Sequence, residues 1–195
     1  GGGQVAPAGF RRYLRGGWLL EVVRTTVVRY LTPYVLSAKS TVSHADLVFV
    51  ANRETRALVE KLGATRIEDM LAIGAVSTWL HDPIPERLNQ DNTLRILWIG
   101  RLLPRKGVLL ALEAMSQIDP DVRFSCTILG DGEQGKYLER WIEELDLSDR
   151  VTWKGSVPYA EAIEADSSHD VMLFTSLRDT DGNQLLEALA HGSAI

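Results

Sequence analysis

The feature that most constrains the fold is an alternation, in the second half of the chain, of short apolar runs with helical patterns. Four runs rich in Val, Ile, Leu, Phe and Trp are separated by segments of helical periodicity; the runs are residues 94–100, 124–130, 151–155 and 171–175. Strands joined by helical crossovers run parallel, and the crossovers are right-handed. The pattern therefore predicts a doubly wound α/β domain with a parallel sheet.

A weaker form of the same pattern occupies the first part of the chain. A buried-strand run at 45–50 precedes a helical pattern. Asn52 is placed to cap this helix, and Gly63 is placed to end it. The apolar run at 70–74 predicts another short strand. This part is therefore expected to belong to a second Rossmann-like domain.

A segment of different composition separates the two patterns. Residues 81–93 hold two prolines, few apolar residues and no periodicity, which predicts a linker. We expect residues 1–80 to be the end of one Rossmann-like domain and residues 94–195 to be a second one. The chain opens on a glycine run and stops where a helix would hand over to a further strand. Both domains are therefore expected to be incomplete pieces of a longer protein.

Charge and composition narrow the class of protein. The 195 residues include 21 basic and 26 acidic side chains, a balance that gives no overall attraction to nucleic acid. No apolar run approaches the roughly 20 residues of a membrane span. The single cysteine, Cys126, lies in an apolar strand pattern and has no partner for an internal disulfide. These features predict a cytoplasmic protein that binds no nucleic acid, with Cys126 as a small buried apolar residue.

The first thirty residues differ, because arginines and aromatic residues are mixed there. The residues concerned are Arg11, Arg12, Arg15, Arg24, Arg29, Phe10, Tyr13, Trp18 and Tyr30. Two interpretations stay open for this segment. One is peripheral contact with an anionic membrane surface, and the other is a solvated helix face.

The loops that follow the predicted strands are the places where a ligand is expected, because doubly wound sheets bind ligands at the carboxyl ends of their strands. The loop "GRLLPRKG" places Arg101 and Lys106 just ahead of a helix. Unpaired amides and the positive end of the helix dipole add to these two cations, which suits a phosphate group. A solvated loop would use the same residues, so this loop alone leaves both interpretations open.

The stretch "RDTDGNQLLEALAHG" supplies a second half for such a site. Gly182 and Asn183 mark a turn into a helix whose first amides are expected to face the same cleft. Glu187 lies among apolar residues of this helix, where a charge is costly to bury without a partner. The hydroxyls of a sugar would serve as that partner. An exposed position for Glu187 and a turn-forming role for Asp179 are the structural alternatives.

The loop "GDGEQG" raises the alternative of a dinucleotide-binding dehydrogenase. Its glycines match G-x-G-x-x-G between a strand and a helix. The dinucleotide fingerprint also wants an acidic residue at the end of the next strand, where this chain has Lys154. The dinucleotide fingerprint, moreover, follows the first strand of a domain, whereas the loop "GDGEQG" follows the second predicted strand. A tight turn into a helix is the structural alternative.

Taken in order, these loops resemble one known family. The segments "ILWIGRLLPRKGVLLALEAM", "TILGDGEQGKYLERWIEELDLSDRVTWKGSVP" and "SLRDTDGNQLLEALAHG" look like the donor-binding domain of group 1 (family 4) retaining glycosyltransferases, which have the two-domain GT-B fold. The stretch "ADLVFVANRETRALVEKLGA" resembles the end of the other domain, although "AIGAV" replaces the usual "PNGVD". The resemblance implies transfer of a sugar, with retention of configuration, from a nucleotide diphosphate sugar to a hydroxyl of a glycan or lipid-linked acceptor. It implies no metal or other cofactor.

The resemblance also assigns roles to two carboxylates. Glu187 matches the last glutamate of the family's E-x7-E motif, which binds the ribose hydroxyls. Asp179 stands at the position of the first glutamate, in the catalytic centre against the donor sugar. Aspartate is one methylene shorter, which leaves the identity of the sugar open. The family's usual catalytic histidine belongs to the part of the amino-terminal domain that precedes this chain.

The remaining donor contacts follow from the same resemblance. The residues matched to the diphosphate are Arg101, Lys106, Gly182, Asn183 and Gln184. Gly155 and Val157 are expected near the base.

Three alternatives to this assignment remain. Asp179, Thr180 and Asp181 spell D-x-D, which binds a divalent metal in the other large glycosyltransferase fold. Arg101 and Lys106 already supply the charge that such a metal would bring. A nucleotide-sugar epimerase or hydrolase would share the donor pocket, and so would a non-catalytic nucleotide-sugar binding module.

Overall fold

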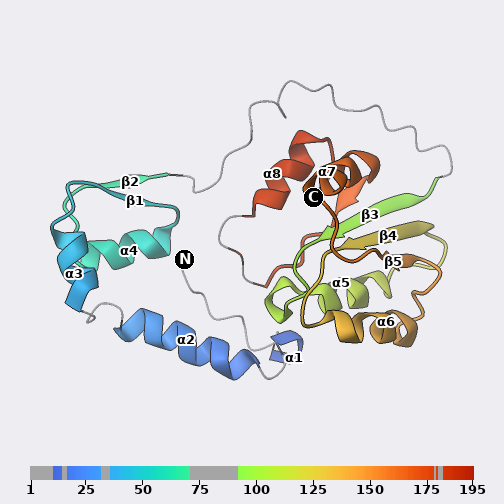
Figure 1. Ribbon diagram of the computed structural model, residues 1–195, viewed down its shortest axis with the longest axis horizontal. Helices are drawn as coiled ribbons and strands as arrows, with labels where there is room; N and C mark the ends of the chain where they lie inside the picture. The colour runs from blue at the N-terminus through green and yellow to red at the C-terminus, as the bar shows by residue number, and fades with distance from the viewer. Residues whose placement is uncertain (1–10, 15–16, 32–35, 71–91, 178, 180–181) are drawn as a thin grey trace. The chain divides into compact units, whose positions relative to one another are not determined.

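The computed structural model describes residues 11–14, 17–31, 36–70, 92–177, 179 and 182–195 (Figure 1). The chain divides into two compact units, Gly1–Gly74 and Ala75–Ile195, and each is described by itself. Most of the predicted linker, residues 81–91, lies outside the described residues. Among the described helices, none combines the length and the apolar character that crossing a membrane would require.

The first unit contains a parallel strand pair joined by a helix. Its elements are α1 (Arg11–Leu14), α2 (Gly17–Leu31), α3 (Leu36–Ser43), β1 (Val48–Val50), α4 (Arg53–Lys61) and β2 (Ile67–Asp69). The predicted cap is confirmed, because the Thr55 amide donates to Asn52 Oδ1 at 2.8 Å. Gly63 follows α4 with φ of 95°, as predicted for the residue that ends this helix.

A strand, β2, ends just before the run predicted as a strand at residues 70–74. Parallel pairing sets Val48 opposite Ile67 and Val50 opposite Asp69, so β2 ends before Met70. Apolarity alone placed the prediction on the later run, whereas β2 contains one apolar and two acidic residues. Residues 71–74 lie outside the described residues.

The second unit is the predicted doubly wound domain. Its elements are β3 (Leu94–Ile99), η4 (Pro104–Lys106), α5 (Val108–Met115), β4 (Phe124–Leu129), α6 (Gly135–Glu144), β5 (Val151–Trp153), α7 (Tyr159–Ser168), β6 (Val171–Met172) and α8 (Asn183–Ala190). The sheet has the order β5-β4-β3-β6, and all of its pairs are parallel. Helices α5 and α6 cover one face of the sheet, and α7 and α8 lie on the other (Figure 1).

Alternation of side chains along the strands builds the core under α5 and α6. Phe124, Cys126 and Ile128 point to this face and pack with buried residues of both helices, including Leu138 and Trp141. Each fully buried large apolar side chain contributes about 1.5–3 kcal/mol. Burial also raises the pKa of the Cys126 thiol to about 12, so this cysteine is an unreactive core residue, as predicted.

The strand order places a crevice at one position of the sheet. The domain's first strand, β3, lies between β4 and β6; the loop after β3 leads to α5 on one face of the sheet, and the loop after β6 leads to α8 on the other (Figure 1). Such a switch point, at the carboxyl ends of the strands, is where doubly wound sheets bind ligands. After α8 the chain returns beside β6, where the Met172 amide donates to the Ala194 carbonyl at 2.7 Å. The predicted passage from α8 toward a further strand is thus confirmed.

Candidate functional site

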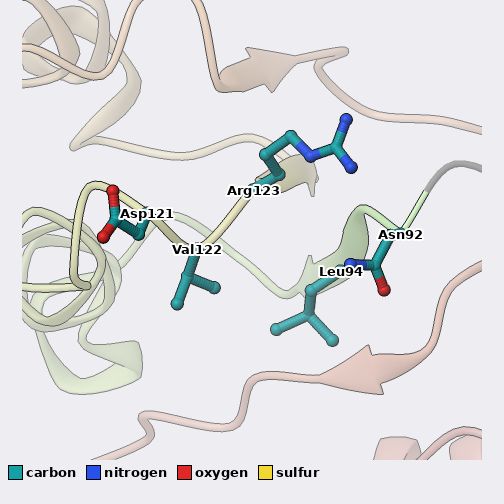
Figure 2. Close-up of a pocket in the computed structure, with 5 residues that line it drawn as sticks. All are labelled: Asn92, Leu94, Asp121, Val122 and Arg123. Atoms are coloured by element: carbon teal, nitrogen blue, oxygen red, sulfur yellow. The ribbon is translucent and has the colours of Figure 1, made fainter.

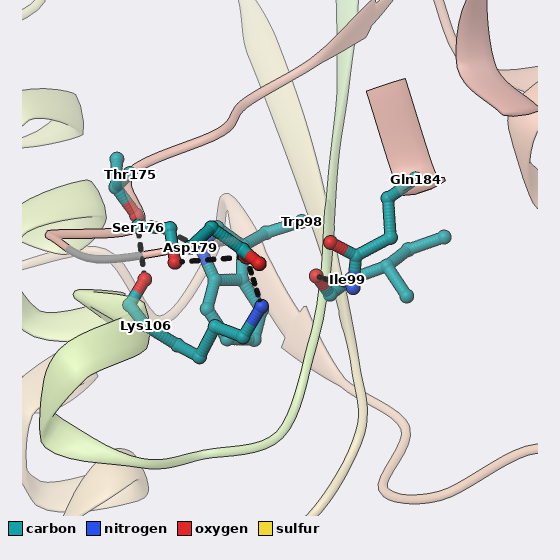
Figure 3. A network of polar contacts seen from close by, with 7 residues as sticks. All are labelled: Trp98, Ile99, Lys106, Thr175, Ser176, Asp179 and Gln184. Carbon is teal, nitrogen blue, oxygen red and sulfur yellow. Dashed lines mark hydrogen bonds and ion pairs between the residues drawn. The ribbon is translucent and has the colours of Figure 1, made fainter. Parts of the chain in front are cut away.

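The loops after β3 and β6 are tied together at the switch point (Figure 3). Thr175 Oγ1 donates to the Gly107 carbonyl at 2.9 Å, and Trp98 Nε1 donates to Thr175 Oγ1 at 3.0 Å. The Leu177 amide donates to the Arg105 carbonyl at 2.8 Å. These contacts join segments about seventy residues apart in the chain, and they hold the two loops in fixed register.

Gly107 is required for this close approach. It links η4 to α5 with φ of 71°, a left-handed conformation that favours glycine. A Cβ atom here would lie 2.3 Å from the Thr175 carbonyl oxygen. Only a residue without a side chain permits this contact between the two loops.

The tied loops bring Lys106 and Asp179 into an ion pair. Lys106 Nζ binds Asp179 Oδ2, and the Ser176 hydroxyl donates to the same oxygen at 3.2 Å (Figure 3). The side chains of Lys106 and Asp179 are 13% and 22% exposed, so both groups are partly screened from water but remain accessible to a ligand. The structure thus brings together two predicted site residues. The contact of Asp179 with Lys106 was not among the predictions.

Arg101, the second predicted cation, begins the same loop. Its side chain is exposed and forms no hydrogen bond or ion pair with any residue that the structure describes. The structure therefore places Arg101 at the carboxyl end of β3 without bringing it into contact with Asp179 or Lys106.

The amino terminus of α8 lies on the β6 side of the switch point. Gly182 precedes the helix with φ of 57°, and no side chain of a described residue caps the helix there. Gln184 Nε2 makes a long contact of 3.4 Å with the carbonyl of Ile99, the last residue of β3 (Figure 3). The amides of Asn183 and Gln184 belong to the first turn, whose N–H groups have no acceptor within the helix. These groups and the helix dipole favour an anion at this end.

Glu187 lies one turn further along α8 and has a hydroxyl partner. The phenol of Tyr159, the first residue of α7, donates to Glu187 Oε1 at 3.0 Å. Desolvation, this hydrogen bond and the negative charge of Glu187 together raise the pKa of Tyr159 to about 12. Glu187 is half-buried, which agrees with a carboxylate that needs a partner and not with an exposed helical position. No motif marked Tyr159 beyond its place at the start of a predicted helix.

The "GDGEQG" loop uses its glycines for packing. A Cβ at Gly130 would lie 1.9 Å from the Gly100 carbonyl oxygen, and one at Gly132 would lie 2.7 Å from that of Leu102. The loop is therefore pressed against the start of the "GRLLPRKG" loop, as expected for a tight turn. The Gly130 amide donates to the Gly155 carbonyl at 2.7 Å, which anchors the loop that contains Gly155 and Val157.

Two other features of the second unit are candidates for a ligand site, a hollow and the D-x-D triplet. A hollow lined by Asn92, Leu94, Asp121, Val122 and Arg123 lies at the amino-terminal edge of β3 and β4, opposite the switch point (Figure 2). No group of three or more His, Cys, Asp or Glu side chains among the described residues is arranged to hold a metal ion. Of the D-x-D triplet, Thr180 and Asp181 lie outside these residues.

Comparison with known proteins identifies relatives of this chain. The family described as "Glycosyl transferases group 1" matches residues 82–195. The gpi3 subunit of phosphatidylinositol N-acetylglucosaminyltransferase from Schizosaccharomyces pombe is 31% identical over 156 residues, which cover 78% of this chain and 33% of that protein. The chain spans about a third of the length of the curated relatives that it matches.

Solved structures share the fold. The apo form of the lipopolysaccharide outer core galactosyltransferase WaaB matches with a TM-score of 0.65 at 20% identity, over 80% of this chain and 44% of that one. Anabaena HepE in complex with UDP matches with a TM-score of 0.64 at 20% identity, over 92% of this chain and 56% of that one. At such identities the match concerns the fold, which is the predicted GT-B type of α/β architecture with parallel sheets. With the family match over more than half of its length, the chain belongs to the group 1 glycosyltransferases.

Proposed function

We propose that this chain carries the donor site of an enzyme that transfers a sugar from a nucleotide diphosphate sugar to a hydroxyl acceptor, with retention of configuration. One observation carries the proposal. The cation of Lys106 and the uncapped start of α8 lie at the same switch point, with the carboxylate of Glu187 one helical turn beyond. This order of charges fits a diphosphate followed by a ribose.

The phosphate groups are assigned to the cations and the helix start. Lys106 and Arg101 neutralise the diphosphate, and the main chain at Gly182, Asn183 and Gln184 donates to its oxygens. When the bond between the sugar and the diphosphate breaks, negative charge grows on the departing nucleotide, and prepositioned donors stabilise this charge. We assign no metal to this step, because the two cations supply the positive charge that a metal would bring.

The other donor groups are assigned to the two carboxylates and the loop after β5. Glu187 accepts from the ribose hydroxyls, and Asp179 lies against the donor sugar in the catalytic centre. Gly155 and Val157 lie beside the base. UDP is bound to the HepE structure of the same fold, which supports a nucleoside diphosphate as the ligand class.

The acceptor is proposed to be a hydroxyl of a glycan or of a lipid-linked sugar, reached from an anionic membrane surface. Strongly exposed apolar side chains of α2 support the membrane contact; they are Leu19, Leu20, Val23, Val27, Tyr30 and Leu31. At 100° per residue they fall within about 120° of the helix circumference, which makes one apolar face. Arg11, whose guanidinium lies 5.0 Å from the Trp18 ring centre, adds positive charge nearby. Sedimentation with anionic and with zwitterionic vesicles tests this contact, and equal binding to both would contradict it.

The donor site is tested by titrating UDP, GDP and ADP into the chain by calorimetry. The proposal predicts that at least one of them binds and that Glu187→Gln weakens it about tenfold to a hundredfold, because a charge-assisted hydrogen bond is lost. Addition of EDTA is expected to leave the affinity unchanged. Unchanged affinity in a folded Glu187→Gln variant would remove the ribose assignment. Release of free sugar or of an epimer, without transfer, would indicate a hydrolase or an epimerase.

A further inference from the structure

We infer that Tyr159 is a positioning residue of the donor site, which orients Glu187 toward the ribose and offers its ring as a stacking surface for the base. The inference rests on the proposed function, because it assumes that a nucleoside diphosphate occupies the switch point. It adds a residue that none of the sequence motifs marks.

The first argument is the order of groups along the site. An α-helix rises 1.5 Å per residue, so Glu187 lies about 6 Å along α8 from Asn183 at its start. A diphosphate at the helix start therefore places a ribose near Glu187. The base leaves the ribose on the side away from the phosphates. Tyr159 contacts Glu187 from α7, so its ring lies next to the carboxylate that is assigned to the ribose.

The second argument is the state of the Tyr159 side chain. Its hydroxyl is engaged by Glu187 Oε1 at 3.0 Å, yet the residue is 59% exposed. The contact therefore fixes the direction of the ring without burying it. An exposed aromatic ring held in one orientation beside a ribose-binding carboxylate is suited to stack on a base, and such stacking accepts every base because each has a π-face.

The third argument is the main chain that precedes Tyr159. Gly155 has φ of 73°, and a Cβ there would meet no atom within 4 Å, so the loop faces open space. The amides of Gly155, Ser156 and Val157 donate no hydrogen bond to any described residue. Donors next to an aromatic surface match the two needs of a base, which are stacking on its face and hydrogen bonding at its edge. Tyr159 would stack on the face of the base, and the loop amides would donate hydrogen bonds to the edge of the base.

The Tyr159–Glu187 hydrogen bond also has a consequence for ribose binding. A carboxylate oxygen accepts more than one hydrogen bond, so Glu187 keeps its contact with the phenol and still accepts from sugar hydroxyls. The phenol thereby selects one rotamer of Glu187 before the ligand arrives. Less conformational freedom is then lost on binding. Loss of the hydroxyl alone is expected to weaken contacts with the ribose hydroxyls and to leave stacking intact.

The test separates the hydroxyl from the ring. The protein is titrated in separate experiments with three ligands. They are the diphosphate that binds best among UDP, GDP and ADP, the 2′,3′-dideoxy analogue of that diphosphate, and inorganic pyrophosphate. The protein variants are Tyr159→Phe, Tyr159→Leu and, as a matched control, Tyr30→Phe, which changes a tyrosine of similar exposure on α2. Thermal unfolding verifies that each variant is folded.

We expect Tyr159→Phe to weaken the ribonucleotide about threefold to tenfold while leaving the dideoxy analogue unchanged, so that the preference for the ribonucleotide shrinks. Tyr159→Leu is expected to weaken both by a further factor of about five or more, through loss of stacking, with pyrophosphate unaffected. Tyr30→Phe should change nothing. Equal effects of Tyr159→Phe on both nucleotides, or no effect on either, would overturn the inference. If no diphosphate binds, or if binding is indifferent to Lys106→Ala and Glu187→Gln, the proposed function itself fails.

Discussion

The two ends of the candidate site hold their acidic side chains in opposite ways. At the phosphate end, defined by Lys106 and Asp179, the carboxylate is paired with a cation. At the nucleoside end, defined by Glu187 and Tyr159, the carboxylate accepts from a neutral phenol. Asp179 therefore neutralises the charge of Lys106, whereas the partner of Glu187 carries no charge that would neutralise the carboxylate.

This difference indicates what each end does when a ligand arrives. Under the proposed function, a diphosphate competes with Asp179 for the Lys106 ammonium, so part of its binding energy is used to separate or share the pair. Under the same proposal, a ribose meets a carboxylate that is already oriented and able to accept further hydrogen bonds. The site is thus balanced in charge at one end and presents an oriented hydrogen-bond acceptor at the other.

Substitution of Gly107 is expected to disrupt the contact between the two loops that carry Lys106 and Asp179. Gly107→Ala is expected to destabilise the second unit by about 2–4 kcal/mol, because the Cβ would strike the Thr175 carbonyl at a left-handed φ. The matched control is Gly155→Ala, which has a similar φ of 73° but no atom within 4 Å of the added carbon. Chemical denaturation should give a cost of about 1 kcal/mol for the control. Similar costs for both variants would show that the close loop contact is not needed.

Removal of Lys106 tests the phosphate end without disturbing the backbone. Lys106→Ala is expected to weaken a nucleoside diphosphate about tenfold to a hundredfold, because charge-assisted contacts with the phosphates disappear. The free nucleoside should bind as before. Arg140→Ala is the control, since Arg140 pairs with Glu144 on the surface of α6. Equal losses for the diphosphate and the nucleoside would move Lys106 away from the phosphates.

The smallest effect concerns the far end of α7, the helix that carries Tyr159. His169 is half-buried, its Nδ1 donates to the Ala165 carbonyl at 2.8 Å, and its Nε2 accepts from Thr127 Oγ1 at 2.9 Å. Burial, with Lys154 and Arg95 nearby, lowers the pKa of His169, although Asp170 and the Ala165 carbonyl act in the opposite sense.

The unfolded chain therefore takes up the proton first as the pH falls. The contribution of His169 to stability is complete above the unfolded pKa of about 6.5 and is lost as the pH falls from there toward the folded value. His169→Asn should lessen the decline in unfolding free energy between about pH 7 and pH 5.5, a window above the ordinary range of carboxyl groups. Parallel curves for the two proteins would contradict this assignment.

Periodicity and turn chemistry were enough to predict most of the fold. The strands of the second unit alternate with helices at spacings that only a parallel sheet accommodates, and the position of each loop follows from this alternation. The cap at Asn52 is local, so it too could be predicted. The position of β2 could not, because Ile67–Asp69 contains two acidic residues and lacks the apolar run on which the prediction relied.

The site was predictable in its location but not in its pairings. Lys106 and Asp179 meet because Thr175 ties their loops together, and neither loop has a period that reveals this contact. Tyr159 meets Glu187 through the packing of α7 on α8, across 28 residues of sequence. Contacts of this kind depend on tertiary structure, and sequence patterns mark only the elements that carry them.

The central claim is that the two carboxylates act with opposite sign on a bound nucleoside diphosphate, and calorimetric titration of Asp179→Asn and Glu187→Gln measures this directly. Asp179→Asn should tighten binding about twofold to fivefold, because it releases Lys106 from a partly exposed ion pair. Glu187→Gln should weaken binding about tenfold or more. A loss of affinity in both variants, or in neither, would contradict the division of the site into a phosphate end and a nucleoside end.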